Sequence, residues 1–350
     1  MRLRGLSLGR MIQGLVGVVR NHAHFTITAW VVAMSLVLSN DTYRVYVRKG
    51  VVRVRSSKGG EVVVGSSIER VIIATSRFSI TAKAIRQLAL MGVDVVVLPP
   101  NGEPIARIYP PIINKTVMTR RCQYEASLNG RGVVVAKALV KAKIMNQANL
   151  LRYIAKSTRS DWVRDEAVSL DELAIHVDSA KDGSTIMELE AQAARHYWQV
   201  FAQLLRDDYG FTGRRQDGGD EFNVMLNYGY GLLRYVVEKS LLIHGFDPYA
   251  GFLHVDRSGK PSLTLDVMEP FRPVVDKALF FARPRVSIVN GYLDYQSRGL
   301  IIKVVFESLN GRAYLGSRAV SALGIINSFI ESLACYLRGD CDLMMPVIRW

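Results

Sequence analysis

Short runs of β-branched residues alternate with turn residues over the first third of the chain. Between residue 35 and about residue 111, Asn-Asp, Lys-Gly, Lys-Gly-Gly and Gly-Ser-Ser turns separate these runs, a pattern typical of β-hairpins. A helical pattern at 81–91 interrupts them and stops at Gly92. The expected strands are 36–38, 43–48, 51–55, 61–64, 71–74 and 93–98. The pattern predicts a small β-rich, β-sandwich-like domain over residues 34–112, with one helix packed on it.

The rest of the chain has the periodicity of amphipathic helices. Two prolines and the basic pair Arg120 and Arg121 precede this region, so we expect 113–125 to be a linker. Apolar stripes then predict helices over 133–155, 170–180, 185–205, 224–244, 274–282, 299–308 and 320–337. No strand pattern of comparable strength returns in the sequence. Residues 126–350 are therefore expected to form a larger all-α domain, and the predicted fold class is α+β.

Residues 1–33 do not match this organisation. They contain four arginines and no acidic residue, and the well-patterned domain begins at Ser35. A signal peptide is the alternative, but the apolar run at 25–38 is shorter than the ~20 residues that span a bilayer. We therefore expect 1–33 to be an upstream translated extension, with Met34 as the true start of the protein.

Composition and charge narrow the class of protein. The 350 residues are 49% hydrophobic and 22% charged, which is typical of a folded protein with about two domains. The net charge of +14 favours a polyanionic partner, although a basic surface that serves only solubility is the alternative. The three cysteines, Cys122, Cys335 and Cys341, are too scattered for a disulfide framework or a zinc site. We expect a cytoplasmic protein in which Cys335 and Cys341 are thiols, although these two could pair.

Candidate metal ligands gather in the stretch 245–276. His254 stands in an apolar setting, a Gly-Lys-Pro turn follows, and Asp266 and Glu269 open a helical pattern. Carboxylates three residues apart lie on one helix face, and the turn can fold His254 back towards them. Glu190, on the edge of the apolar stripe of 185–205, is a third strong acid that could join them. A divalent metal site would use such a group.

Each of these residues also has an ordinary structural interpretation. Asp266 and Glu269 have the spacing of an N-terminal capping box. Glu190 could pair with Arg195, His196 or another base, and His254 could be a hydrogen-bonded core histidine. The basic residues also have both a functional and an ordinary structural interpretation. The loop at 207–223, with Arg214 and Arg215, and the lysines of 133–155 could bind phosphates or simply face solvent.

Several segments together resemble the CRISPR-associated endonuclease and integrase of the spacer-acquisition machinery. They are 142–147 (AKIMNQ), 187–195 (MELEAQAAR), 226–230 (LNYGY), 251–254 (GFLH), 262–266 (SLTLD), and Glu269 with 271–273 (FRP). The resemblance runs from about Met34 to Trp350 and leaves 1–33 without a counterpart. It departs at Asp217-Gly218-Gly219, where the family usually carries a proline pair.

The resemblance implies a metal-dependent DNA endonuclease and integrase that inserts new spacers into a CRISPR array by transesterification. It implies that Glu190, His254 and Glu269, the last after a Ser-Leu strand, hold one Mg²⁺ or Mn²⁺, with Asp266 as a neighbouring catalytic acid. No nucleotide cofactor is implied. The expected DNA contacts are Lys260, Arg272, Arg214, Arg215 and Asn223.

The implied partners are protospacer and repeat DNA, a second copy of the chain bound through the β-rich domain, and a small second subunit, with no membrane. Two rival hypotheses remain. One is a DNA-binding scaffold whose acids only cap and pair, and the other is a generic metal-dependent nuclease. Replacing Glu190 or Glu269 by Ala would separate the scaffold from the two enzymes.

Overall fold

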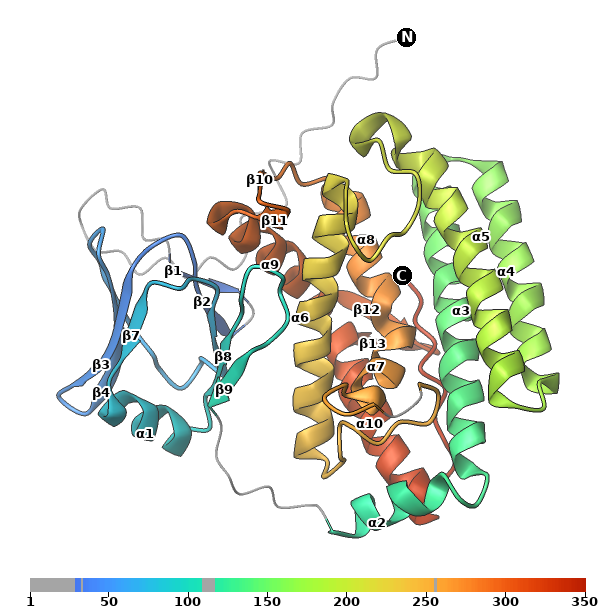
Figure 1. Ribbon diagram of the computed structural model, residues 1–350, viewed down its shortest axis with the longest axis horizontal. Helices are drawn as coiled ribbons and strands as arrows, with labels where there is room; N and C mark the ends of the chain where they lie inside the picture. Colours follow the sequence, from blue (N-terminus) through green and yellow to red (C-terminus); the bar gives the residue numbers. More distant parts are fainter. Residues whose placement is uncertain (1–28, 33, 109–116, 255–256) are drawn as a thin grey trace.

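The computed structural model describes residues 29–32, 34–108, 117–254 and 257–350. A β-rich part and a mostly helical part lie side by side, and α6 (Glu221–Ile243) and α9 (Tyr295–Asn310) of the helical part face the sheets (Figure 1). This order confirms the predicted α+β class. The β-rich part consists of β1 (Ala29–Val32), β2 (Ser35–Leu38), β3 (Tyr43–Arg48), β4 (Val51–Ser56), β5 (Glu61–Val63), β6 (Arg70–Ile73), β7 (Phe78–Ile80), α1 (Ala82–Leu90), β8 (Asp94–Val97) and β9 (Ala106–Ile108).

Two sheets form the β-rich part. One has the order β1-β2-β6-β8-β9, in which β2, β6 and β8 run parallel, and the other has the order β5-β4-β3-β7. Alternate residues of β2 face opposite sides, so Leu36 and Leu38 join the core between the sheets while Val37 joins the core of the helical part. Burial on both faces explains why every residue of β2 and β6 is buried. The five-stranded sheet is therefore the middle layer of the molecule.

The helical part has α6 at its centre. This helix is apolar on nearly all sides, as expected of a helix surrounded by others. The remaining elements are α2 (Val117–Ala126), α3 (Arg131–Thr158), α4 (Asp161–Ser179), α5 (Gly183–Tyr209), α7 (Ser262–Met268), the 3-10 turn η2 (Glu269–Phe271), α8 (Arg272–Ala282), α9 (Tyr295–Asn310), α10 (Ala322–Arg338), and the hairpins β10–β11 (Ile288–Val289, Tyr292–Leu293) and β12–β13 (Arg312–Leu315, Arg318–Ser321).

Two glycines allow α6 to approach the middle sheet. A Cβ atom on Gly231 would lie 2.3 Å from the carbonyl oxygen of Gly102, in the loop between β8 and β9. Gly102 has φ of +80°, and its own Cβ would meet the ring and backbone of Tyr228. The backbone of α6 therefore packs directly against the backbone of the β8–β9 loop. This contact fixes the position of α6 relative to the sheet.

The structure corrects several boundaries expected from the sequence. Most of the expected linker 113–125 forms α2, and residues 29–32 of the expected extension form β1, which pairs with β2; residues 1–28 and 33 lie outside the described residues. The segment expected to be a Ser-Leu strand is the helix α7. Asp266 lies inside that helix, whose N-cap is Pro261, so the alternative interpretation of Asp266 as the cap of a capping box is wrong.

Cysteine pairing also differs from the expectation. Cys335 and Cys341, expected to be thiols, are joined by a disulfide that links the end of α10 to the C-terminal segment, while Cys122 is free. In the described part of the chain, none of the helices combines the length and the apolar character needed to cross a membrane.

Candidate active site

A cavity of about 660 Å³ lies where α3, α5, η2 and the loop before α7 meet. Its lining includes both acidic and basic side chains, among them Lys143, Glu190, Arg214, His254, Glu269 and Arg272. All three predicted metal ligands therefore face one cavity, although they come from segments up to 79 positions apart (190 to 269). Sequence spacing alone could not show that α5 comes close to η2.

Lys143 lies between two of these acids. Its Nζ contacts Oε1 of Glu190 and Oε2 of Glu269, and the side chains of Lys143 and Glu269 are only 9% and 6% exposed. Burial alone would lower the pKa of Lys143, but the two carboxylates raise it, so the ammonium stays charged. The carboxylates of Glu190 and Glu269 therefore converge on one point, which is occupied by a cation.

Arg272 neutralises the same acid from the other side. Its Nη2 lies 2.9 Å from Oε1 of Glu269, and its guanidinium stacks 4.6 Å from the ring centre of Tyr230. Burial would raise the pKa of Glu269, but Arg272 and Lys143 outweigh this effect and hold the pKa at about 2. Glu269 is thus a fully ionised, buried carboxylate at neutral pH.

His254 is oriented by Asp266. Nδ1 of His254 lies 2.6 Å from Oδ1 of Asp266, and this carboxylate also accepts hydrogen bonds from the backbone N–H groups of Phe252, Leu253 and His254. An acceptor at Nδ1 places the ring proton there and leaves the lone pair of Nε2 available to a ligand. Asp266 is fully buried behind His254 and does not line the cavity.

The metal-ligand prediction is only partly reflected in the geometry. Glu190, His254 and Glu269 line one cavity, but among the described residues no group of three or more His, Cys, Asp or Glu side chains is close enough to hold a metal ion. Lys143 takes the position between the two glutamates. Lys143 therefore differs from the expectation that the lysines of 133–155 bind phosphates or face solvent.

The five expected DNA contacts fall into different environments. Arg214 lines the cavity, and Arg215 is more than half exposed. Arg272 is committed to Glu269, and Lys260 lies in the turn before α7. Asn223 is fully buried, which argues against a direct DNA contact.

Asn223 instead holds the loop at 210–220 in place. Its Oδ1 accepts hydrogen bonds from Nη1 of Arg214 and the backbone N–H of Arg215, and its Nδ2 donates to the carbonyl of Gly213 and to Asp220. The loop that departs from the family pattern at Asp217-Gly218-Gly219 is therefore fastened to the start of α6. This arrangement positions Arg214 at the rim of the cavity.

The buried carboxylate of Asp276 lies beneath the cavity. Tyr197 and Tyr230 donate hydrogen bonds of 2.8 and 2.6 Å to Asp276. Burial raises the pKa of Asp276 to about 6, although both hydroxyl groups and Arg272 act in the opposite direction. The network connects α5, α6 and α8 beneath the cavity. Sequence patterns do not predict this network, because they place only Tyr197 in the core, within the apolar stripe of α5.

The chain is similar to known proteins over most of its length. The family model described as CRISPR associated protein Cas1 matches residues 36–303. The CRISPR-associated endonuclease Cas1 of Hyperthermus butylicus is 38% identical over 294 residues, which cover 81% of this chain and 88% of that protein. The CRISPR-associated endonuclease Cas1 1 of Pyrobaculum aerophilum is also 38% identical, over 239 residues that cover 67% of this chain and 78% of that protein.

Solved structures share the same architecture. A casposase bound to an integration product has a TM-score of 0.76 at 24% identity, covering 89% of this chain and 93% of the casposase chain. A Cas1 protein of Thermotoga maritima has a TM-score of 0.73 at 18% identity, covering 88% of this chain and 98% of that one. A chain of a Cas6-RT-Cas1–Cas2 complex has a TM-score of 0.69 at 17% identity, covering 95% of this chain and 37% of its own length.

Proposed function

Since the chain belongs to the Cas1 family of CRISPR-associated proteins, we propose that it is a metal-dependent DNA endonuclease and integrase that inserts spacers into a CRISPR array. The relatives from Hyperthermus butylicus and Pyrobaculum aerophilum are named endonucleases, and the casposase of the same fold is bound to an integration product. The observation that carries the proposal is the convergence of Glu190 and Glu269 on one buried cation inside a cavity that His254 also lines.

The donor set fits a divalent metal. Two carboxylates meet at a point that already accommodates a positive charge, and the hydrogen bond from Nδ1 to Asp266 leaves Nε2 of His254 as a donor. Oxygen ligands with one imidazole suit Mg²⁺ or Mn²⁺. Glu190, His254 and Glu269 would hold the ion, and Lys143 would withdraw from between the glutamates. When bound, the metal would neutralise charge on the transition state and polarise the phosphodiester oxygens.

The protein's own groups would orient the reaction. Arg272 fixes one oxygen of Glu269, and Asp266 fixes the ring of His254, so both ligands are preorganised before DNA binds. Asp266 is thus a positioning residue. Arg214 at the rim would attract a phosphate. A DNA 3′-hydroxyl attacks the repeat phosphodiester in line and the bond to the leaving oxygen breaks; water in place of the hydroxyl gives cleavage.

The proposed partners follow from the same relatives. The complex with TM-score 0.69 contains Cas2, which supports a small second subunit for this chain, and the casposase complex supports DNA. We propose that the β-rich part forms the homodimer and contacts the second subunit. The net charge of +14 agrees with a polyanionic substrate.

A strand-transfer assay tests the proposal. The protein is mixed with Mn²⁺, the second subunit, a supercoiled plasmid that carries a repeat, and a labelled protospacer DNA with either 3′-hydroxyl or 3′-deoxy ends. We expect label on the plasmid only with 3′-hydroxyl ends, and loss of this product with His254→Ala. Cleavage with no joining for either type of end would favour a generic nuclease.

One observation favours the scaffold hypothesis. Lys143 forms ion pairs with both Glu190 and Glu269, as expected if these acids served only to stabilise the fold. The scaffold hypothesis predicts DNA binding with no joining and no cleavage in wild type. It also predicts that Glu190→Gln and wild type are indistinguishable in the assay. A loss of product in Glu190→Gln, with DNA affinity retained, would exclude the scaffold.

A further inference from the structure

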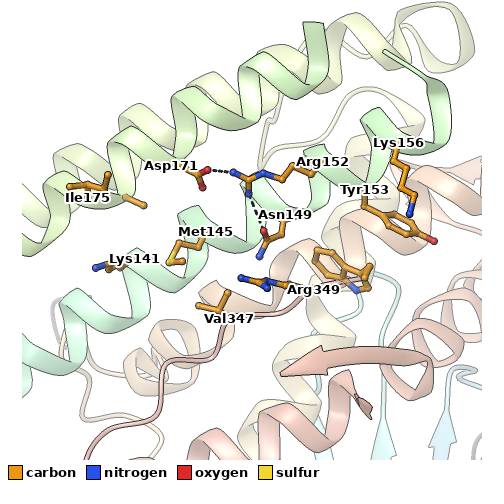
Figure 2. Close-up of a pocket in the computed structure, with 12 residues that line it drawn as sticks. Lys141, Met145, Asn149, Arg152, Tyr153, Lys156, Asp171, Ile175, Val347 and Arg349 are labelled. Atoms are coloured by element: carbon orange, nitrogen blue, oxygen red, sulfur yellow. Dashed lines mark hydrogen bonds and ion pairs between the residues drawn. The ribbon is translucent and has the colours of Figure 1, made fainter. Parts of the chain in front are cut away.

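A second basic cavity lies on the side of α3 that faces away from Lys143. It measures about 690 Å³ and is bounded by α3, α4 and the last residues of the chain (Figure 2). Since successive residues of an α-helix are about 100° apart, Lys141 and Arg152 project from one side of α3 and Lys143 from the other. The body of α3 therefore separates this cavity from the candidate active site.

Positive charge dominates the lining. Four basic residues, Lys141, Arg152, Lys156 and Arg349, line the cavity together with one acidic residue, Asp171. Arg152 pairs with Asp171, and Lys141 pairs with Asp178 of α4. Within the part of the chain that the structure describes, neither Lys156 nor Arg349 forms an ion pair, and both are exposed. Two cations are thus available to an anion that enters from solvent.

Arg152 and Arg349 bring guanidinium groups to the cavity from two distant segments of the chain. Figure 2 shows Arg349 of the C-terminal segment across from Arg152 and Asn149 of α3. Burial and the nearby charge of Arg349 lower the pKa of Arg152. A phosphate bound by Arg349 would relieve this repulsion and would accept hydrogen bonds from its guanidinium.

The position of Arg349 is set by backbone contacts on both sides. Its N–H and carbonyl form hydrogen bonds of 3.0 and 2.9 Å with Tyr314 of β12. Asn146 of α3 accepts a hydrogen bond from the N–H of Ile348, and Asn149 donates to the Ile348 carbonyl. The segment that carries Arg349 is therefore fastened along α3.

Aromatic rings line the same cavity. Tyr153 and Trp350 both belong to its lining, and the ammonium of Lys277 lies 5.4 Å from the centre of the first ring and 5.9 Å from the centre of the second. Basic side chains beside aromatic rings are typical of surfaces that bind single-stranded nucleic acid, where phosphates take the charges and unpaired bases stack on the rings. In a duplex, base faces are already stacked, so the rings would find no partner.

We propose that this cavity is a second nucleic-acid site, which binds a single-stranded segment through phosphates on Lys156 and Arg349 and a base on Tyr153 or Trp350. The inference shares with the proposed function only the premise that the chain binds nucleic acid. It requires neither a metal nor catalysis, so its test can be done without either.

The test uses the full chain in EDTA and a fluorescent single-stranded oligonucleotide that contains 5-iododeoxyuridine. Fluorescence anisotropy measures affinity against salt concentration, and ultraviolet crosslinking with peptide mass spectrometry locates the base. We expect crosslinks at Tyr153 or Trp350. The double variant Lys156→Ala/Arg349→Ala should bind about tenfold more weakly, with the salt slope reduced by roughly 1.4, because each neutralised phosphate of a single strand contributes about 0.7.

The matched control is Lys83→Ala/Arg86→Ala, which removes two exposed positive charges from α1 in the β-rich part. It should retain both affinity and crosslinks. Crosslinks only at other residues, or equal losses in the two double variants, would overturn the proposal. So would displacement of the oligonucleotide by inorganic phosphate at an equal concentration of phosphate groups, since that would indicate a small-anion site. If Glu190→Gln lost strand transfer but kept these crosslinks, the two sites would be distinguished.

Discussion

Oδ1 of Asp266 lies 2.6 Å from Nδ1 of His254, and the two oxygens of this carboxylate also accept hydrogen bonds from three consecutive backbone N–H groups. One buried acid therefore fixes both the loop at 252–254 and the ring that the loop carries. Gly251 allows this approach, because a Cβ atom there would lie 2.8 Å from Oδ2 of Asp266. The position of the candidate ligand His254 thus depends on a residue that does not line the cavity.

Asp266→Asn should weaken metal binding without touching a metal ligand. The amide has one acceptor oxygen instead of two, so it cannot satisfy the N–H groups of Phe252–His254 and also accept from Nδ1. We expect Mn²⁺ affinity, measured by isothermal titration calorimetry, to fall about 10- to 100-fold, as for other groups that orient metal ligands. The free energy of unfolding should fall by about 1–3 kcal/mol for each N–H left without a partner.

The control for this variant is Asp247→Asn. Asp247 lies in the same region of the chain, but its side chain bonds to Tyr124 and to the N–H of Tyr249, away from His254. It should keep wild-type Mn²⁺ affinity. Unchanged affinity in Asp266→Asn would mean that the orientation of His254 does not depend on this carboxylate.

Lys143→Met should make the folded protein depend on metal. Without the ammonium, Glu190 and Glu269 face each other while Arg272 still pairs with Glu269, and breaking a buried ion pair costs about 3–5 kcal/mol. We expect a lower melting temperature in EDTA than that of wild type. Mn²⁺ should then raise the melting temperature of the variant by more than it raises that of wild type, because no lysine competes for the site.

Lys141→Met is the matched control for this experiment. Lys141 lies two residues away on the opposite side of α3 and pairs with Asp178, whose side chain is 61% exposed. An exposed pair contributes about 0–1 kcal/mol, so this variant should melt close to wild type with and without Mn²⁺. Equal Mn²⁺ shifts in Lys143→Met and wild type would show that the lysine does not occupy the metal position.

Asp276 should make a contribution to stability that falls as pH rises. Its carboxyl has a pKa of about 6 when folded and an ordinary value of 3.8. Below about pH 4 the carboxyl is protonated in both the folded and the unfolded state. Between about pH 4 and pH 6 the unfolded chain ionises this group while the folded protein keeps it protonated, so the free energy of unfolding falls as pH rises. Above about pH 6 the group is ionised in both states. The stability of wild type relative to Asp276→Asn should fall by on the order of 2–3 kcal/mol between about pH 4 and pH 7.

Urea unfolding of both proteins across this pH range measures the difference. The control is Asp178→Asn, which removes an exposed carboxylate and measures how far the loss of one surface charge alone changes the unfolding curves. A wild-type advantage over Asp276→Asn that is flat, or that grows with pH, would show that Asp276 is ionised in the folded protein near pH 4.

The sequence predicted the elements that have long, regular patterns. The stripes of α3, α5 and α6 span several turns each, so their periodicity stands out, and β2 and β6 carry unbroken apolar runs because both faces are buried. Three-residue strands such as β7 and β9 were missed since they owe their structure to pairing with a neighbour. The helix α2, expected to be a linker, buries only Thr119, Gln123 and Ala126 and packs against α10, so it has no long apolar stripe to reveal it.

The sequence indicates which residues are candidates for the site, but it does not show which of them lie next to one another. Glu190 and His254 were recognisable because a carboxylate beside an apolar stripe and an imidazole in an apolar run are costly without partners. The partner of Glu190 is Lys143, 47 positions earlier in the chain. The helical pattern of 133–155 does not distinguish Lys143 from Lys141. The choice between a buried and an exposed lysine depended on which face of α3 meets α5, and that is decided by tertiary packing.

Gly231→Ala should disturb the site through the contact between α6 and the middle sheet. The added Cβ would meet the carbonyl oxygen of Gly102 at 2.3 Å, so backbone must move, at a cost of about 1–3 kcal/mol. The adjacent Tyr230 stacks on Arg272 and hydrogen-bonds Asp276, so displacement of α6 should also reduce Mn²⁺-dependent strand transfer. Gly183→Ala, at the open start of α5, should be neutral or slightly stabilising in the same urea titration. Equal free energies of unfolding for Gly231→Ala and Gly183→Ala would mean that the β8–β9 loop moves aside at little cost. The sheet would then not determine the position of α6.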